Sequence, residues 1–220
     1  MRVVTAIIAA LAACAAVPAA AGAATLQPLK PCYRSVDQST RESVPVVADG
    51  FTPGETVTVS IDGIVVNTDV VADQDGRITG AVTAPYEARG ERPFTITVTD
   101  AQHPENTATT ASRVAALDAR LKPRRARPSS RVRFLGRGFV DGTAIYGHYL
   151  RAGKLRKTVL LGAPVGPCGR LDAVHRQIPV RRPATGRWTL QIDNQPEYSP
   201  LPASVFVRLA ITVRRVIRTR

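Results

Sequence analysis

The stretch "GRGFVDGTAIYGHYL" (residues 136–150) decides the fold, because its pattern has already occurred once in the chain. The earlier copy is "DGFTPGETVTVSI" (49–61), with the same Gly-Phe-x-x-Gly followed by alternating residues. In each copy we expect the Phe to cap one end of a core. The second Gly should occupy a tight turn that needs a positive φ, and a strand should follow. The motif residues are Gly50, Phe51, Gly54, Gly138, Phe139 and Gly142.

Two further matches follow in the same order. "DGRI" (75–78) corresponds to "CGRL" (168–171), and "FTITV" (94–98) corresponds to "WTLQI" (188–192). The offset between copies grows from 88 to 94 residues along the chain. Ordered matches with a slowly growing offset predict two copies of one unit of about 90 residues, not a long solenoid. We therefore predict domains at 24–112 and 113–220.

The sequences of both units have the pattern of short strands separated by turns. "TVTVSI" (56–61) and "FTITVTD" (94–100) alternate apolar and polar residues, the pattern of a half-buried strand. In "WTLQID" (188–193), Trp188 shares one face with the two following alternate residues. Gly, Pro and Asp mark frequent turns, and no helical period is sustained after residue 23. The prediction is an all-β chain with two tandem β-sandwiches of about 90–100 residues each.

The Gly-Phe-x-x-Gly pattern with its later "DQDGRI" turn (73–78) resembles the immunoglobulin-like repeats of exported bacterial proteins, including IPT/TIG-type domains. The resemblance covers nearly all of the chain after residue 23. It implies an immunoglobulin-like fold and a secreted or cell-surface setting, but no particular activity.

The first 23 residues have the composition of a signal peptide. Met1-Arg2 is a minimal basic region, residues 3–17 are apolar, and Ala21-Gly22-Ala23 is an A-x-A cleavage site. The exported chain would then begin near Ala24. An alternative is the lipobox-like "LAAC" (11–14), with Cys14 carrying a lipid, but the apolar region continues past Cys14 to the A-x-A site. No later stretch is long enough for a membrane-spanning helix.

The cysteine count predicts one disulfide bond. Of three cysteines, Cys14 would be lost with the signal peptide, which leaves Cys32 and Cys168, 136 positions apart. Two cysteines in an exported protein favour a disulfide over free thiols. This bond would join the two predicted domains.

Charge is distributed unequally between the two domains. Residues 24–112 contain 6 Lys and Arg against 12 Asp and Glu, whereas residues 113–220 contain 23 against 5. The net charges are therefore −6 and +18. Of the 30 basic residues, 26 are Arg, whose planar donor fork suits phosphate and carboxylate.

The excess of basic residues in the second domain suggests a contact surface there. We hypothesise that it binds an anionic envelope polymer, lipid headgroups or a surface protein. The alternative is a solvated surface, part of which faces the acidic first domain. Export and the lack of RNA- or DNA-binding motifs argue against nucleic acid. The predicted polyanion-binding residues are Arg124, Arg125, Arg127, Arg151, Lys154, Arg156 and Lys157.

No catalytic motif is present, so we expect neither an enzyme nor a cofactor or metal site. His148 and His175 lie in alternating runs and are expected to be strand residues with satisfied side chains. "DQDG" (73–76) lacks the later ligands of a calcium loop and is predicted to be a hairpin turn. "DNQPE" (193–197) is equally interpreted as a turn.

A second candidate function is the carriage of a small hydrophobic ligand. Residues 132–143 resemble a run in the immunoglobulin-like apoproteins that carry enediyne chromophores. Those proteins have two disulfides within one domain, whereas each domain here has a single cysteine. The sequence therefore favours a non-catalytic binding or structural module at the cell envelope. A hydrophobic-ligand carrier and an unrecognised secreted enzyme remain the alternatives.

Overall fold

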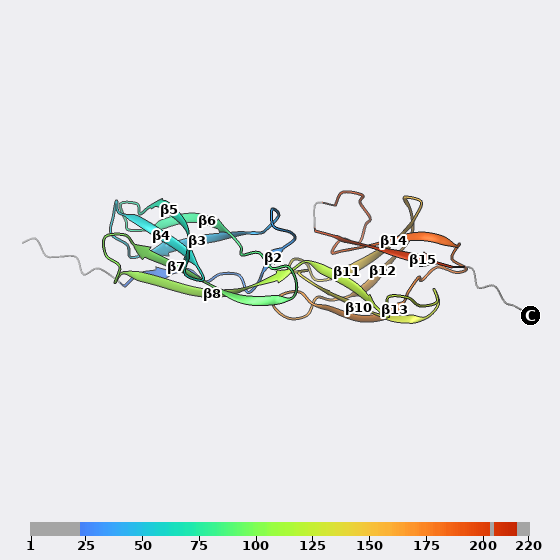
Figure 1. Ribbon diagram of the computed structural model, residues 1–220. Helices are drawn as coiled ribbons and strands as arrows, with labels where there is room; N and C mark the ends of the chain where they lie inside the picture. The colour runs from blue at the N-terminus through green and yellow to red at the C-terminus, as the bar shows by residue number, and fades with distance from the viewer. Residues whose placement is uncertain (1–22, 203–204, 215–220) are drawn as a thin grey trace, which may run out of the picture.

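The computed structural model describes residues 23–202 and 205–214. These residues form fifteen strands that build two β-sandwiches lying end to end (Figure 1). The predicted all-β fold with two immunoglobulin-like sandwiches is confirmed. Residues 1–22 of the predicted signal peptide, which include the alternative lipid site at Cys14, lie outside the described residues. The described residues contain no helix of the length and hydropathy that crossing a membrane requires.

The first sandwich packs a three-stranded sheet against a five-stranded sheet. The sheets have the strand orders β1-β3-β6 and β2-β8-β7-β4-β5. All pairs are antiparallel except β2 with β8. The strands are β1 (Thr25–Leu26), β2 (Tyr33–Ser35), β3 (Ser43–Asp49), β4 (Thr56–Ile61), β5 (Ile64–Val71), β6 (Ile78–Thr83), β7 (Glu91–Asp100) and β8 (Thr107–Ala116). Alternate residues of β4 and β7 face the core, as their sequence period predicts.

The second sandwich repeats this plan, with β10 to β15 equivalent to β3 to β8. The sheets have the orders β13-β10-β9 and β12-β11-β14-β15, and all pairs are antiparallel. The strands are β9 (Asp118–Lys122), β10 (Arg131–Arg137), β11 (Ile145–Arg151), β12 (Lys154–Gly162), β13 (Leu171–Arg176), β14 (Gly186–Asp193) and β15 (Val207–Val213). Trp188, Phe134 and Tyr149 are among the buried residues of its core.

The repeated sequence matches meet in space in both sandwiches. The N–H of Phe51 donates to the carbonyl of Gly76 at 3.0 Å, and the N–H of Phe139 donates to that of Gly169 at 3.3 Å. Both phenylalanines are buried. The Gly-Phe pattern and the later Gly-Arg pattern are therefore two halves of one local structure that closes one end of each core.

The motif glycines adopt the positive φ that the turns require. Gly54 and Gly142, the second glycines of the two copies, have φ of 79° and 87°. Gly50 and Gly138, which precede the phenylalanines, have φ of 89° and 80°. Residues with a side chain rarely adopt this region, which explains why glycine recurs at all four positions.

The junction between the sandwiches is short. Only Leu117 separates β8 from β9, and the predicted boundary between residues 112 and 113 falls inside β8, whose ladder continues to Ala116. The N–H of Leu117 donates to the carbonyl of Ser35 at 2.8 Å. The chain therefore passes from one sandwich to the next without a flexible linker.

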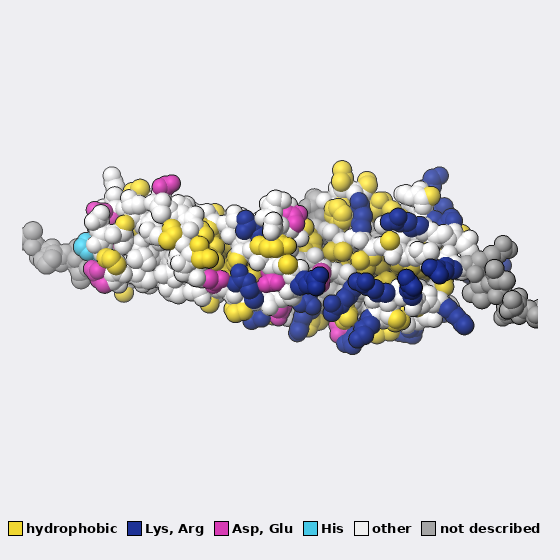
Figure 2. All heavy atoms as spheres, viewed as in Figure 1, with side chains coloured by type: hydrophobic (Ala, Val, Ile, Leu, Met, Phe, Trp, Pro, Cys, Tyr) yellow, Lys and Arg dark blue, Asp and Glu magenta, His cyan; other side chains and the backbone are white. Residues whose placement is uncertain are grey.

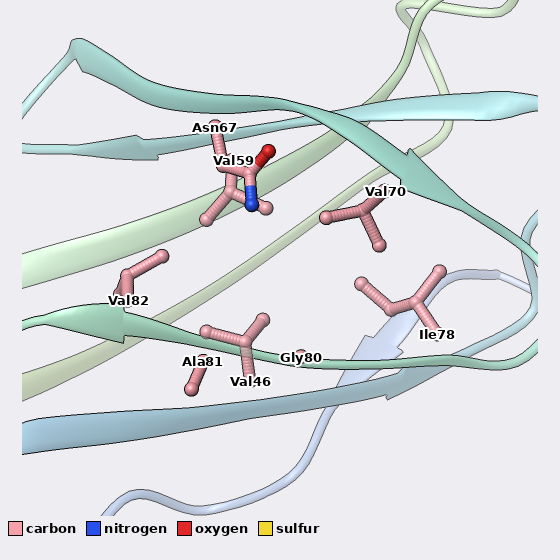
Figure 3. A pocket seen from close by; sticks show the side chains of 8 residues that line it. All are labelled: Val46, Val59, Asn67, Val70, Ile78, Gly80, Ala81 and Val82. Atoms are coloured by element: carbon pink, nitrogen blue, oxygen red, sulfur yellow. The ribbon is translucent and has the colours of Figure 1, made fainter.

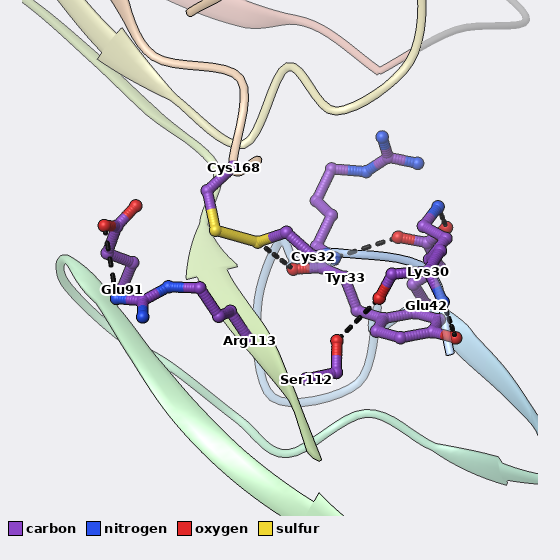
Figure 4. The surroundings of a disulfide bond; sticks show 9 residues. Lys30, Cys32, Tyr33, Glu42, Glu91, Ser112, Arg113 and Cys168 are labelled. Carbon is purple, nitrogen blue, oxygen red and sulfur yellow. Dashed lines mark hydrogen bonds and ion pairs between the residues drawn. A yellow bond between two sulfur atoms is a disulfide. The ribbon is translucent and has the colours of Figure 1, made fainter. Parts of the chain in front are cut away.

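A disulfide and two ion pairs cross this junction. Cys32 and Cys168 form the disulfide bond that the cysteine count predicts, and Ala115 packs with it (Figure 4). The Asp141 carboxylate of the second sandwich lies 2.7 Å from the Arg34 guanidinium and 3.7 Å from the Lys30 ammonium of the first. The hydrogen bond from Arg34 lowers the pKa of Asp141, against the opposing effect of partial burial.

We expect a Cys32→Ser/Cys168→Ser variant to keep both sandwiches folded but to widen the range of angles between them in acid. Because the native pKa of Asp141 is lowered, its ion pairs are intact above its unfolded pKa of about 3.9 and are lost as the pH falls through the native value. Small-angle X-ray scattering at about pH 7 and about pH 3 measures the change, and circular dichroism checks folding. The disulfide-bonded protein is the control. Identical scattering curves for the two proteins in acid would contradict the expectation.

Candidate anion-binding groove

The loop between β9 and β10 (residues 123–130) places three arginines at the end of the second sandwich farthest from the first. β9 starts beside the junction and runs away from it, so this loop lies at the far end. Backbone hydrogen bonds hold the loop: the N–H of Ile178 donates to the carbonyl of Pro128, and that of Gln177 to the carbonyl of Ser130, both at 2.9 Å. These bonds anchor the backbone at the end of the loop that carries the arginines.

The loop forms one wall of a groove, and β15 forms the other. The groove has a volume of about 570 Å³ and continues into a second hollow of about 290 Å³, with which it shares Arg124 and Ala210. Two edge strands, β9 of one sheet and β15 of the other, lie side by side here. We call the two hollows together the distal groove; it is lined by Ala119, Arg120, Leu121, Arg124, Arg125, Ala126, Arg127, Pro128, Gln177, Leu209, Ala210, Thr212 and Arg214.

The groove arginines are exposed, and their charges are not neutralised by acidic partners among the described residues. Acidic partners hold other arginines of the second sandwich: Arg133 pairs with Asp172, and Arg137 with Asp118 at 3.3 Å. Within residues 23–202 and 205–214, none of the five groove arginines lies in an ion pair; they are Arg120, Arg124, Arg125, Arg127 and Arg214. Figure 2 shows basic side chains gathered over the second sandwich and sparse over the first. The positive surface at this end does not face the acidic domain.

The seven residues predicted to bind a polyanion separate into two groups. Arg124, Arg125 and Arg127 line the distal groove. The other four lie on the hairpin of β11 and β12: Arg151, Lys154, Arg156 and Lys157. Because β12 and β15 are opposite edges of one sheet, three strand spacings, or about 14 Å, separate them. The structure therefore brings the first group together with Arg120 and Arg214 and leaves the hairpin group apart.

Sequence reasoning did not single out Arg120 and Arg214, although both belong to basic runs that are visible in the sequence. Arg120 precedes the loop by three positions, and Arg214 is 87 positions beyond Arg127. Only the neighbouring positions of β9 and β15 bring these residues to one groove. No local pattern reports that proximity.

His148 belongs to a buried polar network on the outer side of the four-stranded sheet. Its Nε2 lies 3.1 Å from Asp193 Oδ1, and its Nδ1 lies 3.0 Å from Thr158 Oγ1. The amide of Gln191 donates to Asp193 Oδ2 at 2.8 Å, and Arg208 Nε donates to Gln191 at 3.0 Å. His148, Asp193 and Gln191 have no exposed surface. These contacts satisfy the imidazole, in keeping with its interpretation as a strand residue.

The remaining polar candidates take part in local structure. Asp73 Oδ1 accepts the N–H groups of Asp75 at 3.0 Å and Arg77 at 2.9 Å, so residues 73–76 form a turn closed by its own carboxylate. His175 Nε2 contacts the carbonyl of Leu161 at 2.9 Å. His103 is exposed beside Glu105.

A cavity between the sheets of the first sandwich bears on the hydrophobic-carrier alternative. Its lining is mainly aliphatic and comes from β3, β4, β5 and β6 (Figure 3). The volume is about 10 Å³, which is room for about one water molecule and not for a drug-sized ligand. This cavity therefore has no room for a hydrophobic ligand.

Neither a known protein family nor a curated protein matches the sequence. Among solved structures, titin domains Z1 and Z2 in complex with telethonin match at 17% identity, with 89% of this chain and 98% of that one covered and a TM-score of 0.29. A membrane-anchored protein of Corynebacterium diphtheriae matches at 13% identity, with 88% and 57% covered and a TM-score of 0.34.

A Bacteroides ovatus glucan-utilisation protein, SGBP-B, solved with a mixed-linkage heptasaccharide, matches at 18% identity. The match covers 82% of this chain and 42% of that one, with a TM-score of 0.25. At these TM-scores the likenesses support no argument about function. The IPT/TIG type remains a prediction from the sequence.

Proposed function

We propose that this protein is a non-catalytic binding module of the cell envelope that attaches to an extended polyanion through the distal groove. One observation carries the proposal: five exposed arginines surround the groove, and no acidic side chain of the described residues pairs with them. The disulfide between Cys32 and Cys168 supports an oxidising, extracytoplasmic setting. Export through the N-terminal segment is part of the proposal.

The shape of the groove favours a polymer over a compact anion. Its two hollows share Arg124 and Ala210, and the arginines are distributed over both, with Arg120 lining one hollow and Arg214 the other. Guanidinium groups bind phosphate or carboxylate through paired N–H donors. The binding energies of several such contacts along one polyanion add up. Salt weakens these contacts because the guanidinium groups are exposed.

The hairpin group acts differently in this proposal. Lys154, Arg156 and Lys157 lie on β12 at the other edge of the sheet, and Arg151 lies at the end of the neighbouring strand β11. They raise the positive potential around the distal end and speed the approach of an anion, but they do not line the groove. Binding strength should therefore depend on the groove arginines more than on the hairpin.

The test compares two triple variants of residues 24–220 that each remove three positive charges. One is Arg124→Gln/Arg125→Gln/Arg127→Gln in the groove, and the other is Lys154→Gln/Arg156→Gln/Lys157→Gln on the hairpin. At about 1 kcal/mol for each cation, we expect the groove variant to bind about 100-fold more weakly and the hairpin variant less than about 10-fold more weakly. Co-sedimentation with isolated envelope material and titration with inorganic polyphosphate and poly-glutamate measure the affinities.

Each outcome has a definite meaning. A larger loss in the groove variant, together with binding that falls steeply with salt, supports the proposal. Equal losses would show that net charge alone attracts the polymer. Salt-insensitive binding or the absence of binding to all three probes would overturn it. Poly-glutamate and polyphosphate together distinguish a carboxylate from a phosphate ligand.

A further inference from the structure

An exposed apolar surface lies on the edge strand β5 of the first sandwich. Ile64 is 71% exposed, and Val65, Val66 and Val71 of the same strand are also exposed. β5 is the last strand of the five-stranded sheet, so no strand formed by residues 23–202 or 205–214 pairs with its outer backbone edge. An edge strand of this kind commonly carries Lys or Pro, which prevent association, but "IVVNTDVV" (64–71) contains neither.

The equivalent strand of the second sandwich, β12, also exposes apolar side chains, but it carries Lys154 and Lys157, which disfavour the pairing of β12 with another β12. β12 is the edge strand of the four-stranded sheet, and both Leu155 and Leu160 are exposed, Leu160 to 54%. Single exposed apolar residues are ordinary, but four of them on β5 form a larger apolar surface, and the two leucines of β12 can cover part of it.

The charges around the two strands are opposite. Residues 62–76, which contain β5, include four Asp and no Lys or Arg. Asp62 is paired with Arg92 at 2.8 Å, so the acids that remain for a contact are Asp69, Asp73 and Asp75. Residues 151–161, which include most of β12, contain four Lys and Arg and no Asp or Glu. Contact between two β5 strands would bring acids together, and contact between two β12 strands would bring cations together. Contact between β5 and β12 pairs opposite charges and covers apolar surface on both strands.

One chain cannot make this contact with itself. β5 and β12 belong to different sandwiches, which lie end to end and are held by the short connection at Leu117 and by the disulfide (Figure 1). The partner must therefore be another molecule. The β4–β5 and β11–β12 ladders each shift register twice, so the contact is made by side chains and not by one continuous ladder.

We propose that the β5 surface of one copy of this protein binds the β12 surface of a second copy. The two surfaces differ, so the same contact can build a closed dimer or a longer chain of copies. This contact uses the hairpin group of basic residues and leaves the distal groove free. It does not depend on the proposed polyanion binding, and the two can fail separately.

The test measures the mass of residues 24–220 by sedimentation velocity over a range of concentrations. We expect association in about 0.05 M salt that weakens at least about 10-fold in about 0.5 M salt, because the charges are exposed. Val66→Lys should weaken association at least about 10-fold by opposing the cations of β12, and Leu160→Glu should do the same by opposing the acids around β5. Each variant retains one intact surface, so an equimolar mixture of the two should associate again.

Two control variants introduce the same residue types, Lys and Glu, at exposed apolar positions outside the two surfaces. Val36→Lys and Leu201→Glu alter exposed apolar residues outside β5 and β12 and should leave association unchanged. A wild-type protein that stays monomeric at every concentration overturns the proposal. So does normal association of Leu160→Glu alone, because that result would mean that β5 contacts another β5. Circular dichroism of each variant excludes unfolding as the cause of a loss.

Discussion

Replacing Gly169 by alanine is expected to destabilise the second sandwich by roughly 3–5 kcal/mol. Gly169 has a φ of +56°, and a Cβ there would lie 2.1 Å from the carbonyl oxygen of Phe139. That oxygen is backbone and cannot move aside as a flexible side chain would. The variant therefore combines an unfavourable φ with a collision that must displace the repeated motif from the core.

Gly153→Ala is the matched control for this prediction. Gly153 also has a positive φ, +74°, but a Cβ there would have nothing within 4 Å. The Gly153→Ala variant should therefore be destabilised only by the unfavourable φ of its alanine, by about 1–2 kcal/mol. Denaturant unfolding followed by tryptophan fluorescence measures both variants, because Trp188 is the only tryptophan of the chain and lies in the second core. Equal losses for the two variants would show that the contact with Phe139 is unimportant.

The same prediction applies to the first sandwich. A Cβ at Gly76 would lie 2.3 Å from the carbonyl oxygen of Phe51, and the φ of Gly76 is +72°. Gly76→Ala should therefore destabilise the first sandwich to a similar extent, which circular dichroism can follow. Such agreement between the two domains would show that the repeated sequence pattern encodes one shared piece of local structure.

Asp193→Ala is expected to cost about 3–5 kcal/mol, because it removes one partner of a fully buried polar network. His148 and Gln191 would lose the carboxylate that accepts their hydrogen bonds and would stay buried without it. Asp172→Ala is the control: its ion pair with Arg133 is about half exposed, so its loss should change the stability far less. Denaturant unfolding of the two variants near neutral pH measures the difference.

The pH dependence of this effect has a definite sign. Burial alone would raise the pKa of Asp193, but the hydrogen bonds from His148, Gln191 and the N–H of Gln195 outweigh it, so the native pKa is lowered. The stability that Asp193 contributes is thus complete above its unfolded pKa of about 3.9 and is lost as the pH falls through the native pKa. The wild type and Asp193→Ala should differ most above about pH 4 and converge in acid. A constant difference down to about pH 2 would contradict this account.

Local sequence patterns predicted the architecture because they report local physics. The alternation in "FTITVTD" places Phe94, Ile96 and Val98 in the core, since side chains of a strand alternate between its faces. The glycines of the repeated motif mark turns that need a positive φ. The pairing of Cys32 with Cys168 follows from a count and a compartment, because no other cysteine would remain after export.

The contacts in the network around His148 could not be predicted from local sequence patterns. His148, Thr158, Asp193 and Arg208 are separated by up to 60 positions, and nothing in their local patterns predicts contact. They meet because β11 pairs with both β12 and β14, and β14 pairs with β15. The register of those strands, decided by packing of the other face of the sheet, places His148 opposite Thr158 and Gln191.

Two β-sandwiches, the repeat that relates them, the disulfide and the concentration of positive charge in the second half could all be predicted from the amino-acid sequence. Each of these depends on period, turn chemistry or composition, which need no long-range contacts. Which basic residues share a surface depends instead on how the strands are arranged in the folded protein. The placement of β9 beside β15 unites Arg120, the loop arginines and Arg214, while the order of the other sheet holds the hairpin group at its opposite edge. Which edges become neighbours depends on how two sheets pack over a common core, and charge has no part in specifying that packing.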